Sequence, residues 1–113
     1  MPISPSMIGA TSPLWEIELT RDGGTFDLTN QQASWITLNF YSNVQTTPGS
    51  YTFLSTGTGT VTILSERPGI IQYKREATDT NTLTPGQYWI RAIVKMNGTD
   101  PDPGDYMPLF LGA

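Results

Sequence analysis

Residues 85–98 read PGQYWIRAIVKMNG, an extended segment that runs directly into a hairpin turn. Apolar side chains occupy every second position of this segment, namely Tyr88, Ile90, Ala92 and Val94. A period of two is typical of a β-strand that buries one of its faces. Asn97-Gly98 follows at once, and both residues tolerate the positive φ of a two-residue hairpin turn. The stretch therefore predicts a long strand over residues 87–96 that turns back into an antiparallel partner.

Shorter segments on both sides carry the same alternation. The pattern predicts strands or extended segments over residues 14–20, 26–28, 33–41, 51–54, 60–64, 70–74 and 106–111. Gly and Pro turns separate them, and Pro108 indicates an edge position for the last strand. No stretch predicts an amphipathic helix, although Asp79 can cap a single helical turn within residues 76–83. We therefore expect an all-β fold: a single immunoglobulin-like antiparallel β-sandwich of about seven strands, over residues 14–113.

The composition supports one small β domain. The chain has 113 residues, of which 37% are hydrophobic and only 14% are charged, while 17 threonines, 11 glycines and 9 prolines fill the difference. Three Trp, five Tyr and four Phe are too many buriable rings for a disordered segment. Threonine and aromatic residues suit a pleated sheet better than a helix.

Several residue types are missing or scarce, and their absence excludes whole classes of function. The chain has no cysteine and no histidine, so thiolate and imidazole metal ligands, disulfides and the commonest general base are all absent. A net charge of −4 argues against binding to nucleic acid. We expect no membrane span and no signal peptide, and hence a protein that is either made and kept in a reducing cytoplasm or assembled there into something larger.

The acidic residues do not predict a catalytic or metal site. Asp100, Asp102 and Asp105 lack the spacing of a calcium-binding loop, and the prolines between them favour a stiff, solvated loop. Glu16 and Glu18 share one face of a strand, where both are expected to be solvated rather than tuned for acid–base chemistry. We therefore predict no enzyme activity, no metal and no cofactor.

The second face of the predicted strands is the informative anomaly. If the alternating apolar residues form the core, a set of large side chains points away from it, namely Trp35, Tyr41, Trp89, Arg91 and Ile93. Trp, Tyr and Arg are the preferred anchors of protein interfaces, so this set predicts a partner-binding surface. The alternative is that a loop or the N-terminal segment covers one of these strands.

Residues 1–13 have no periodicity and predict an extended N-terminal arm. Its large apolar side chains beyond Met1 are Ile3, Met7 and Ile8, which are few to bury against the same domain. Three prolines lower the entropy cost of ordering the arm on a neighbouring molecule. We expect these residues to bind a partner, and we expect loss of the arm to change the stability of the domain little; a frayed terminus is the alternative.

The order of motifs resembles the immunoglobulin-like domain at the N-terminus of baseplate upper proteins of tailed bacteriophages. The matching residues are Gly23-Gly24, Phe26-Asp27-Leu28-Thr29, Ile36/Leu38/Phe40, Gly69-Ile70-Ile71-Gln72-Tyr73, Asp79-Thr80, Leu83-Thr84-Pro85-Gly86-Gln87-Tyr88 and Asn97-Gly98. The resemblance covers residues 14 to 111. It implies a non-enzymatic virion component of the baseplate, tail or neck that binds other virion proteins and copies of itself.

Two other readings remain open. The first is a head-decoration protein bound to a capsid lattice, which an ordered arm at residues 1–13 would favour. The second is a carbohydrate-binding module in which coplanar Trp35, Trp89 and Tyr41 stack on sugar rings.

Overall fold

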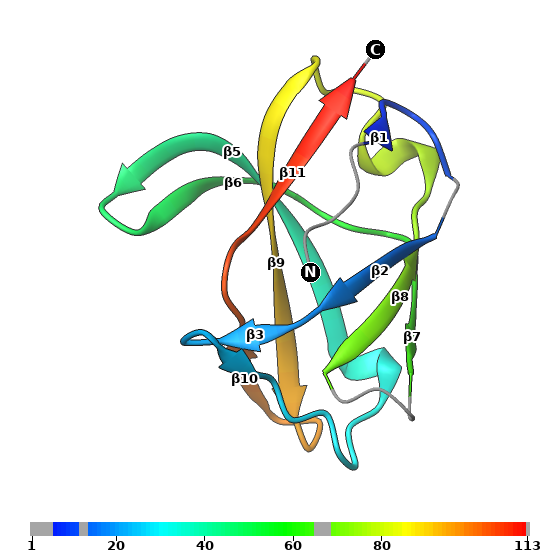
Figure 1. Cartoon of the computed structure of the whole chain (residues 1–113), viewed down its shortest axis with the longest axis vertical. Helices are drawn as coiled ribbons and strands as arrows, with labels where there is room; N and C mark the ends of the chain where they lie inside the picture. Colours follow the sequence, from blue (N-terminus) through cyan, green and yellow to red (C-terminus); the bar gives the residue numbers. More distant parts are fainter. Residues whose placement is uncertain (1–5, 12–13, 65–68, 113) are drawn as a thin grey trace.

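Two β-sheets face each other and enclose one hydrophobic core (Figure 1). The computed structural model describes residues 6–11, 14–64 and 69–112. The larger sheet has the strand order β1-β11-β9-β5-β6, with β10 paired to β9. Its strands are β1 (Ser6–Met7), β5 (Ile36–Thr47), β6 (Ser50–Thr56), β9 (Gly86–Met96), β10 (Asp100–Pro103) and β11 (Met107–Gly112).

The smaller sheet has the order β2-β8-β7, and a separate two-stranded hairpin is formed by β3 and β4. These strands are β2 (Trp15–Glu18), β3 (Thr20–Arg21), β4 (Gly24–Thr25), β7 (Thr60–Ile63) and β8 (Ile70–Lys74). In the described residues the helical elements are two 3-10 turns, η1 (Ala33–Trp35) and η2 (Ala77–Asp79).

The topology is that of an immunoglobulin-like sandwich. In chain order, β2, β5, β7, β8, β9 and β11 take the places of strands B, C, D, E, F and G, because β5-β9-β11 form one sheet and β2-β8-β7 the other. The prediction of an all-β sandwich is therefore confirmed. One pairing departs from the expected antiparallel arrangement, since β1 runs parallel to β11.

The core contains the side chains that the alternation predicted. Leu38, Phe40 and Ile90 from the larger sheet meet Ile17 and Ile71 from the smaller one, and each of these side chains is almost fully buried. Burying a large aliphatic or aromatic side chain contributes about 1.5–3 kcal/mol, so this shared cluster is what joins the two sheets.

Two hairpin turns have positive φ at both central residues, and the turn at Asn97-Gly98 has the predicted conformation. Asn97 and Gly98 have φ values of 53° and 80°, and Thr99 N–H donates to the carbonyl of Met96 across the turn. Asp22 and its neighbour Gly23 have φ values of 53° and 83° between β3 and β4. Positive φ at both central residues gives the turn twist that matches twisted antiparallel strands.

Three segments differ from the prediction. Ala33–Trp35 forms η1 rather than the start of a strand, so the alternation begins only at Ile36. Asp100–Pro103, predicted as a loop, forms β10. Phe26 and Leu28 are buried as expected, but they lie outside any strand after β4.

The N-terminal segment lies on its own domain over its described residues. Ser6 and Met7 pair with the end of β11, and Ile8 N–H donates to Gly112 at 2.9 Å. The Trp15 indole N–H donates to Ser6 Oγ at 2.8 Å. Ile8 is partly buried and packs against the core of its own domain, whereas the sequence predicted that it binds a partner. A short parallel pairing of this kind leaves no periodic signal in the sequence.

The far ends of β5 and β6 project from the body as a hairpin (Figure 1). β5 pairs with β9 from Ile36 to Ser42, and beyond this point it pairs only with β6. We call residues 43–52 the projecting hairpin; its turn is at Pro48-Gly49, where Gly49 has a φ of 83°.

Candidate functional site: an aromatic patch at the base of the hairpin

Five aromatic rings meet on the outer face of the larger sheet, where the projecting hairpin joins the body. We call them the aromatic patch: Tyr41, Tyr51, Phe53, Trp89 and Tyr106. Tyr51 stacks on Trp89, with ring centroids 4.6 Å apart and an interplanar angle of 16°. Tyr106 meets Tyr51 and Tyr41 edge-on at 5.0 and 5.1 Å, and Phe53 meets Tyr41 edge-on at 5.8 Å. Stacked and edge-on pairs are the favoured aromatic geometries, so the rings hold one another in place.

Strand register explains why these rings meet. Tyr41 is directly opposite Trp89 on β9 and opposite Phe53 on β6, and directly opposed residues share a face of the sheet. Register shifts between Tyr41 and Gln45 then let Tyr51 reach across to Trp89. Tyr106 enters from the segment between β10 and β11. A bulged pairing of β5 and β6 therefore closes the patch.

Two polar side chains fix the patch from its sides. Arg91 donates from Nε to the carbonyl of Gly104 at 2.8 Å, and its guanidinium lies 4.6 Å from the ring centroid of Tyr106. The Trp89 indole N–H donates to Asn43 Oδ1 at 2.7 Å, which ties the projecting hairpin to the body. A cation over an aromatic face and a hydrogen bond from the indole N–H both add rigidity to the rings.

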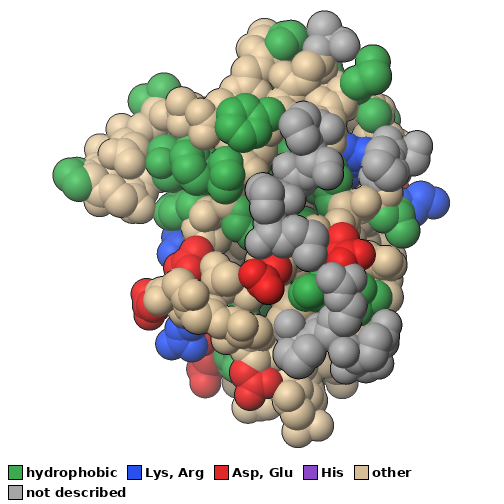
Figure 2. All heavy atoms as spheres, in the orientation of Figure 1, with side chains coloured by type: hydrophobic (Ala, Val, Ile, Leu, Met, Phe, Trp, Pro, Cys, Tyr) green, Lys and Arg blue, Asp and Glu red, His purple; other side chains and the backbone are tan. Residues whose placement is uncertain are grey.

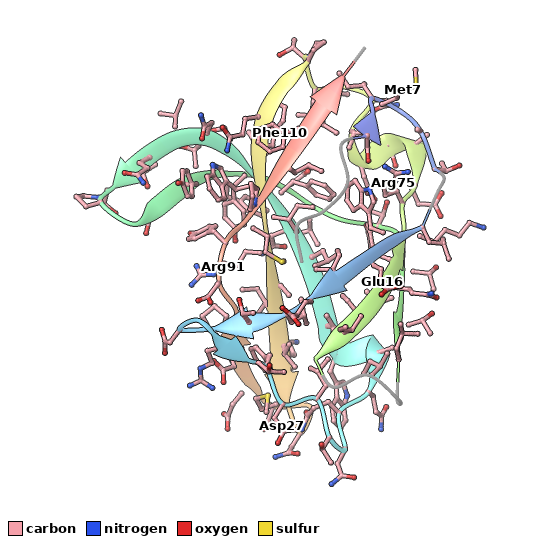
Figure 3. All side chains as sticks on the ribbon, viewed as in Figure 1. Met7, Glu16, Asp27, Arg75, Arg91 and Phe110 are labelled. Carbon is pink, nitrogen blue, oxygen red and sulfur yellow. The ribbon has the colours of Figure 1, made fainter. Side chains whose placement is uncertain are left out.

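Apolar side chains extend the patch into solvent. Phe53 is 53% exposed, and Phe110 on β11, two residues after the Pro108 that is opposite Trp89, is 47% exposed. Figure 2 shows hydrophobic side chains gathered where the hairpin meets the body, with the charged side chains of this side lying lower. Figure 3 shows Phe110 and Arg91 on opposite sides of the hairpin base. The exposed surface is therefore apolar at its centre and charged at one margin.

The structure brings together only some of the predicted partner-binding residues. Tyr41, Trp89 and Arg91 lie in or beside the aromatic patch, and Ile93 lies farther along the same face of β9, opposite Thr37. Tyr41 is buried beneath its neighbours rather than exposed.

Trp35 is separate from the patch. It lies in η1, and its ring borders Gly98 in the turn after β9. Because β9 rises roughly 3.3 Å per residue, more than about 20 Å of strand separates this turn from Trp89. The 3-10 turn breaks the alternation that placed Trp35 on the face of Tyr41. Of the arm residues, Met7 is 62% exposed at the edge formed by β1, and Ile3 lies outside the described residues.

Sequence reasoning missed four aromatic residues of this surface: Tyr51, Phe53, Tyr106 and Phe110. Tyr51 and Phe53 alternate within the predicted strand over residues 51–54, and this was the available signal. Tyr106 and Phe110 alternate in the same way within the predicted strand over residues 106–111, although Tyr106 itself precedes β11 in the structure.

The acidic side chains serve structural contacts. Asp105 accepts hydrogen bonds from Thr20 Oγ1 and from the N–H groups of Asp22 and Gly23, and these bonds, the Gly23 one above all, hold the pKa of Asp105 below its usual value. Asp102 forms an ion pair with Arg21. Within the described ranges, no group of three or more His, Cys, Asp or Glu side chains is placed to hold a metal ion.

A buried polar cluster lies between the sheets, away from the patch. Asp79 accepts hydrogen bonds from the hydroxyl of Tyr73 at 2.6 Å and from the backbone N–H of Thr58 at 2.9 Å. Burial and the adjacent carboxylate raise the pKa of Tyr73 well above its usual value. Arg75 is buried nearby with its guanidinium 4.5 Å from the ring centroid of Trp15, and burial lowers its pKa. These groups fix the segment between β6 and β7 in place.

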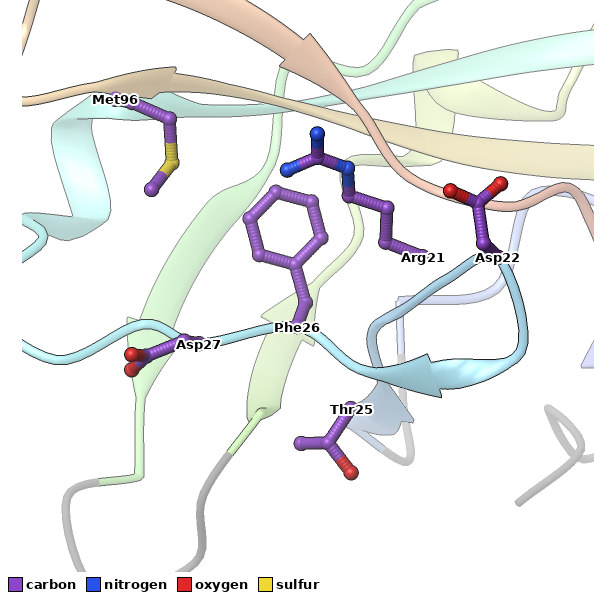
Figure 4. Close-up of a pocket in the computed structure, with 6 residues that line it drawn as sticks. All are labelled: Arg21, Asp22, Thr25, Phe26, Asp27 and Met96. Atoms are coloured by element: carbon purple, nitrogen blue, oxygen red, sulfur yellow. The ribbon is translucent and has the colours of Figure 1, made fainter.

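An open hollow lies near the β3–β4 hairpin (Figure 4). Its volume is about 360 Å³, and its lining includes Arg21, Phe26 and Met96. Arg21 is already paired with Asp102, and Phe26 is part of the core. The hollow is open to solvent, and its lining also includes the polar side chains of Asp22, Thr25 and Asp27.

Comparisons with known proteins give no match: no family model, no curated protein and no solved structure is similar to this chain. In the part of the chain that the structure describes, no helix has the length and apolar character needed to cross a membrane.

Proposed function

We propose that this chain is a non-enzymatic structural or adaptor protein that binds other proteins through the aromatic patch. The observation that carries the proposal is the preformed cluster of rings at the base of the projecting hairpin, in which Phe53 is exposed, Tyr51, Trp89 and Tyr106 are half-buried and Tyr41 is buried. Aromatic residues and arginine are enriched in the buried centres of protein interfaces. Contiguous exposed apolar surface rimmed by polar groups marks interaction sites more often than chance.

The contacts within the patch favour binding. Tyr51 and Trp89 are already stacked, and Arg91 is already held by Gly104 and Tyr106. A partner that covers such rings would not have to order them first, so less conformational entropy is lost on association. The absence of histidine and cysteine from the sequence, together with the structural contacts of Asp79 and Asp105, gives little basis for catalysis.

The assembly that we propose is the virion of a tailed bacteriophage, in its baseplate, tail or neck. This part of the proposal depends on the resemblance over residues 14–111, which implies an immunoglobulin-like fold and partners among virion proteins. Assembly would then take place in the host cytoplasm. The immunoglobulin-like strand order is consistent with that family, but the assignment to a virion depends on the motifs alone.

The two alternatives have less support. A head-decoration role relied on an arm ordered by a capsid lattice, whereas residues 6–8 lie on β11 of their own domain. A carbohydrate platform required three coplanar rings. Trp35 is remote from Trp89, Tyr41 is buried edge-on to its neighbours, and one face of Trp89 is covered by Tyr51.

The test uses particles produced from the genome that encodes this chain. Antibodies against the purified protein should label a fixed position on the particles, and the double variant Phe53→Ser/Phe110→Ser should be incorporated far less than wild type. Leu14→Ser is the matched control, since Leu14 is also exposed but precedes β2 in the smaller sheet. Particles without label would refute the virion assignment. Equal incorporation of the double variant and the control would refute the patch as the binding surface.

A further inference from the structure

β6 forms one edge of the larger sheet. Among the described residues it pairs with β5 alone, so the backbone groups along its other side have no strand partner. The strand is seven residues long, and part of it belongs to the projecting hairpin. An edge strand presents a row of N–H and C=O groups onto which a further strand can be added.

β6 lacks the charged side chains, the proline and the short length that protect most edge strands. Natural edges are blunted by charged side chains, by proline or by short length. β6 contains no charged residue and no proline, and it exposes Phe53 and Leu54. The other sheet ends in β7, which is only four residues long. Of the register shifts between β5 and β6, one places its extra residue, Leu54, in β6 itself, while the other two place theirs in β5.

The distribution of charge along the chain indicates which strand would pair with the free edge of β6. All sixteen charged residues lie within residues 1–27 and 66–113, so residues 28–65 carry none. The net charge of −4 makes two copies repel each other over most of their surface, but this repulsion is smallest at β5 and β6. Because β6 carries no charge, a charged partner segment would find no opposite charge on this edge. The β6 strand of a second copy is equally neutral, so it would pair without charge repulsion at the edge.

We infer that β6 pairs with β6 of a second copy, antiparallel about a two-fold axis, to continue the larger sheet across the dimer. An isologous interface places the same patch on both subunits, which suits a strand whose side chains, apart from Leu54, are hydroxylated or aromatic. Threonine pairs and aromatic pairs opposite each other both stabilise an antiparallel ladder. This inference rests on the proposed function in that it names one partner of the same surface.

Single cysteines provide the test, because the natural chain has none. In an antiparallel two-fold pairing, only positions near the middle of the strand face their own copies. Cross-linking through the thiol should therefore be strongest for Thr52→Cys or Leu54→Cys and should decline towards Thr56→Cys. Thr62→Cys is the matched control on the edge strand β7 and should not cross-link. Equal cross-linking at all three β6 positions, none at any of them, or a maximum at residue 62 would overturn the inference.

A charge placed at the edge gives an independent measurement. Leu54→Lys puts like charges close together in the dimer and should weaken self-association in sedimentation equilibrium by at least about tenfold. Thr62→Lys adds the same charge to β7 and should change it by less than about twofold. Circular dichroism of both variants verifies that they fold.

The two proposals fail in different ways. A wild-type chain that stays monomeric at about 100 μM, far above the Kd of a specific dimer, would refute the pairing of β6. Incorporation of the chain into particles is measured separately, so its outcome still decides the proposed function.

Discussion

Replacing Trp89 by alanine removes the ring that joins the projecting hairpin to the body of the sheet. Two contacts are lost: the stack on Tyr51, at 4.6 Å, and the indole hydrogen bond to Asn43, at 2.7 Å. An aromatic pair contributes about 0.5–1.5 kcal/mol beyond burial, and a hydrogen bond contributes about 0.5–1.5 kcal/mol net. We therefore expect Trp89→Ala to lower the free energy of unfolding by about 1–3 kcal/mol.

A second tryptophan gives the comparison. Trp15 is 2% exposed within the core, and Trp15→Ala should cost about 3–5 kcal/mol, the range for a fully buried ring. Urea unfolding followed by circular dichroism measures both variants on the same scale. In hydrogen exchange, amides of residues 43–52 should exchange faster in Trp89→Ala, while those of β5 opposite β9 should not.

Two results would refute this reasoning. A loss of stability for Trp89→Ala equal to that of Trp15→Ala would show that Trp89 belongs to the core and not to a surface cluster. Unchanged exchange in residues 43–52 would show that the stack with Tyr51 does not hold the hairpin in place.

Three further predictions concern other parts of the chain. Gly98→Val should lower the free energy of unfolding by about 1–3 kcal/mol in urea unfolding, because a Cβ at this φ of +80° is strained and would lie 3.1–3.2 Å from the Trp35 ring. The pKa of Asp105 is lower in the folded chain than in the unfolded chain. Its contribution to stability is therefore complete above the unfolded pKa and is lost as the pH falls through the folded pKa. Below about pH 4, the melting temperature should fall less steeply with pH in Asp105→Ala than in wild type. Deletion of residues 1–10 should lower the melting temperature measurably, because the segment pairs with β11 and packs on the core. An unchanged melting curve would show that these contacts do not stabilise the domain.

Local patterns in the sequence determined most of the sandwich. Alternation with a period of two identifies β2, β8, β9 and the first half of β5, because consecutive side chains of a strand point to opposite faces and one face must be apolar. The turn at Asn97-Gly98 was predictable for an equally local reason, since both residues tolerate positive φ. Missing residue types excluded classes of site without any structure.

Tertiary structure alone decided which side chains meet on the outer face. Tyr41 and Trp89 are 48 positions apart in sequence, and their contact depends on a register between β5 and β9 that neither segment encodes by itself. A single 3-10 turn removed Trp35 from this face, and bulges in β5 and β6 brought Tyr51 onto it. Likewise, the short pairing of β1 with β11 is too brief to leave a period in the sequence. Non-local pairing sets the composition of the aromatic patch, because a shift of one residue in any of these strands would exchange its two faces.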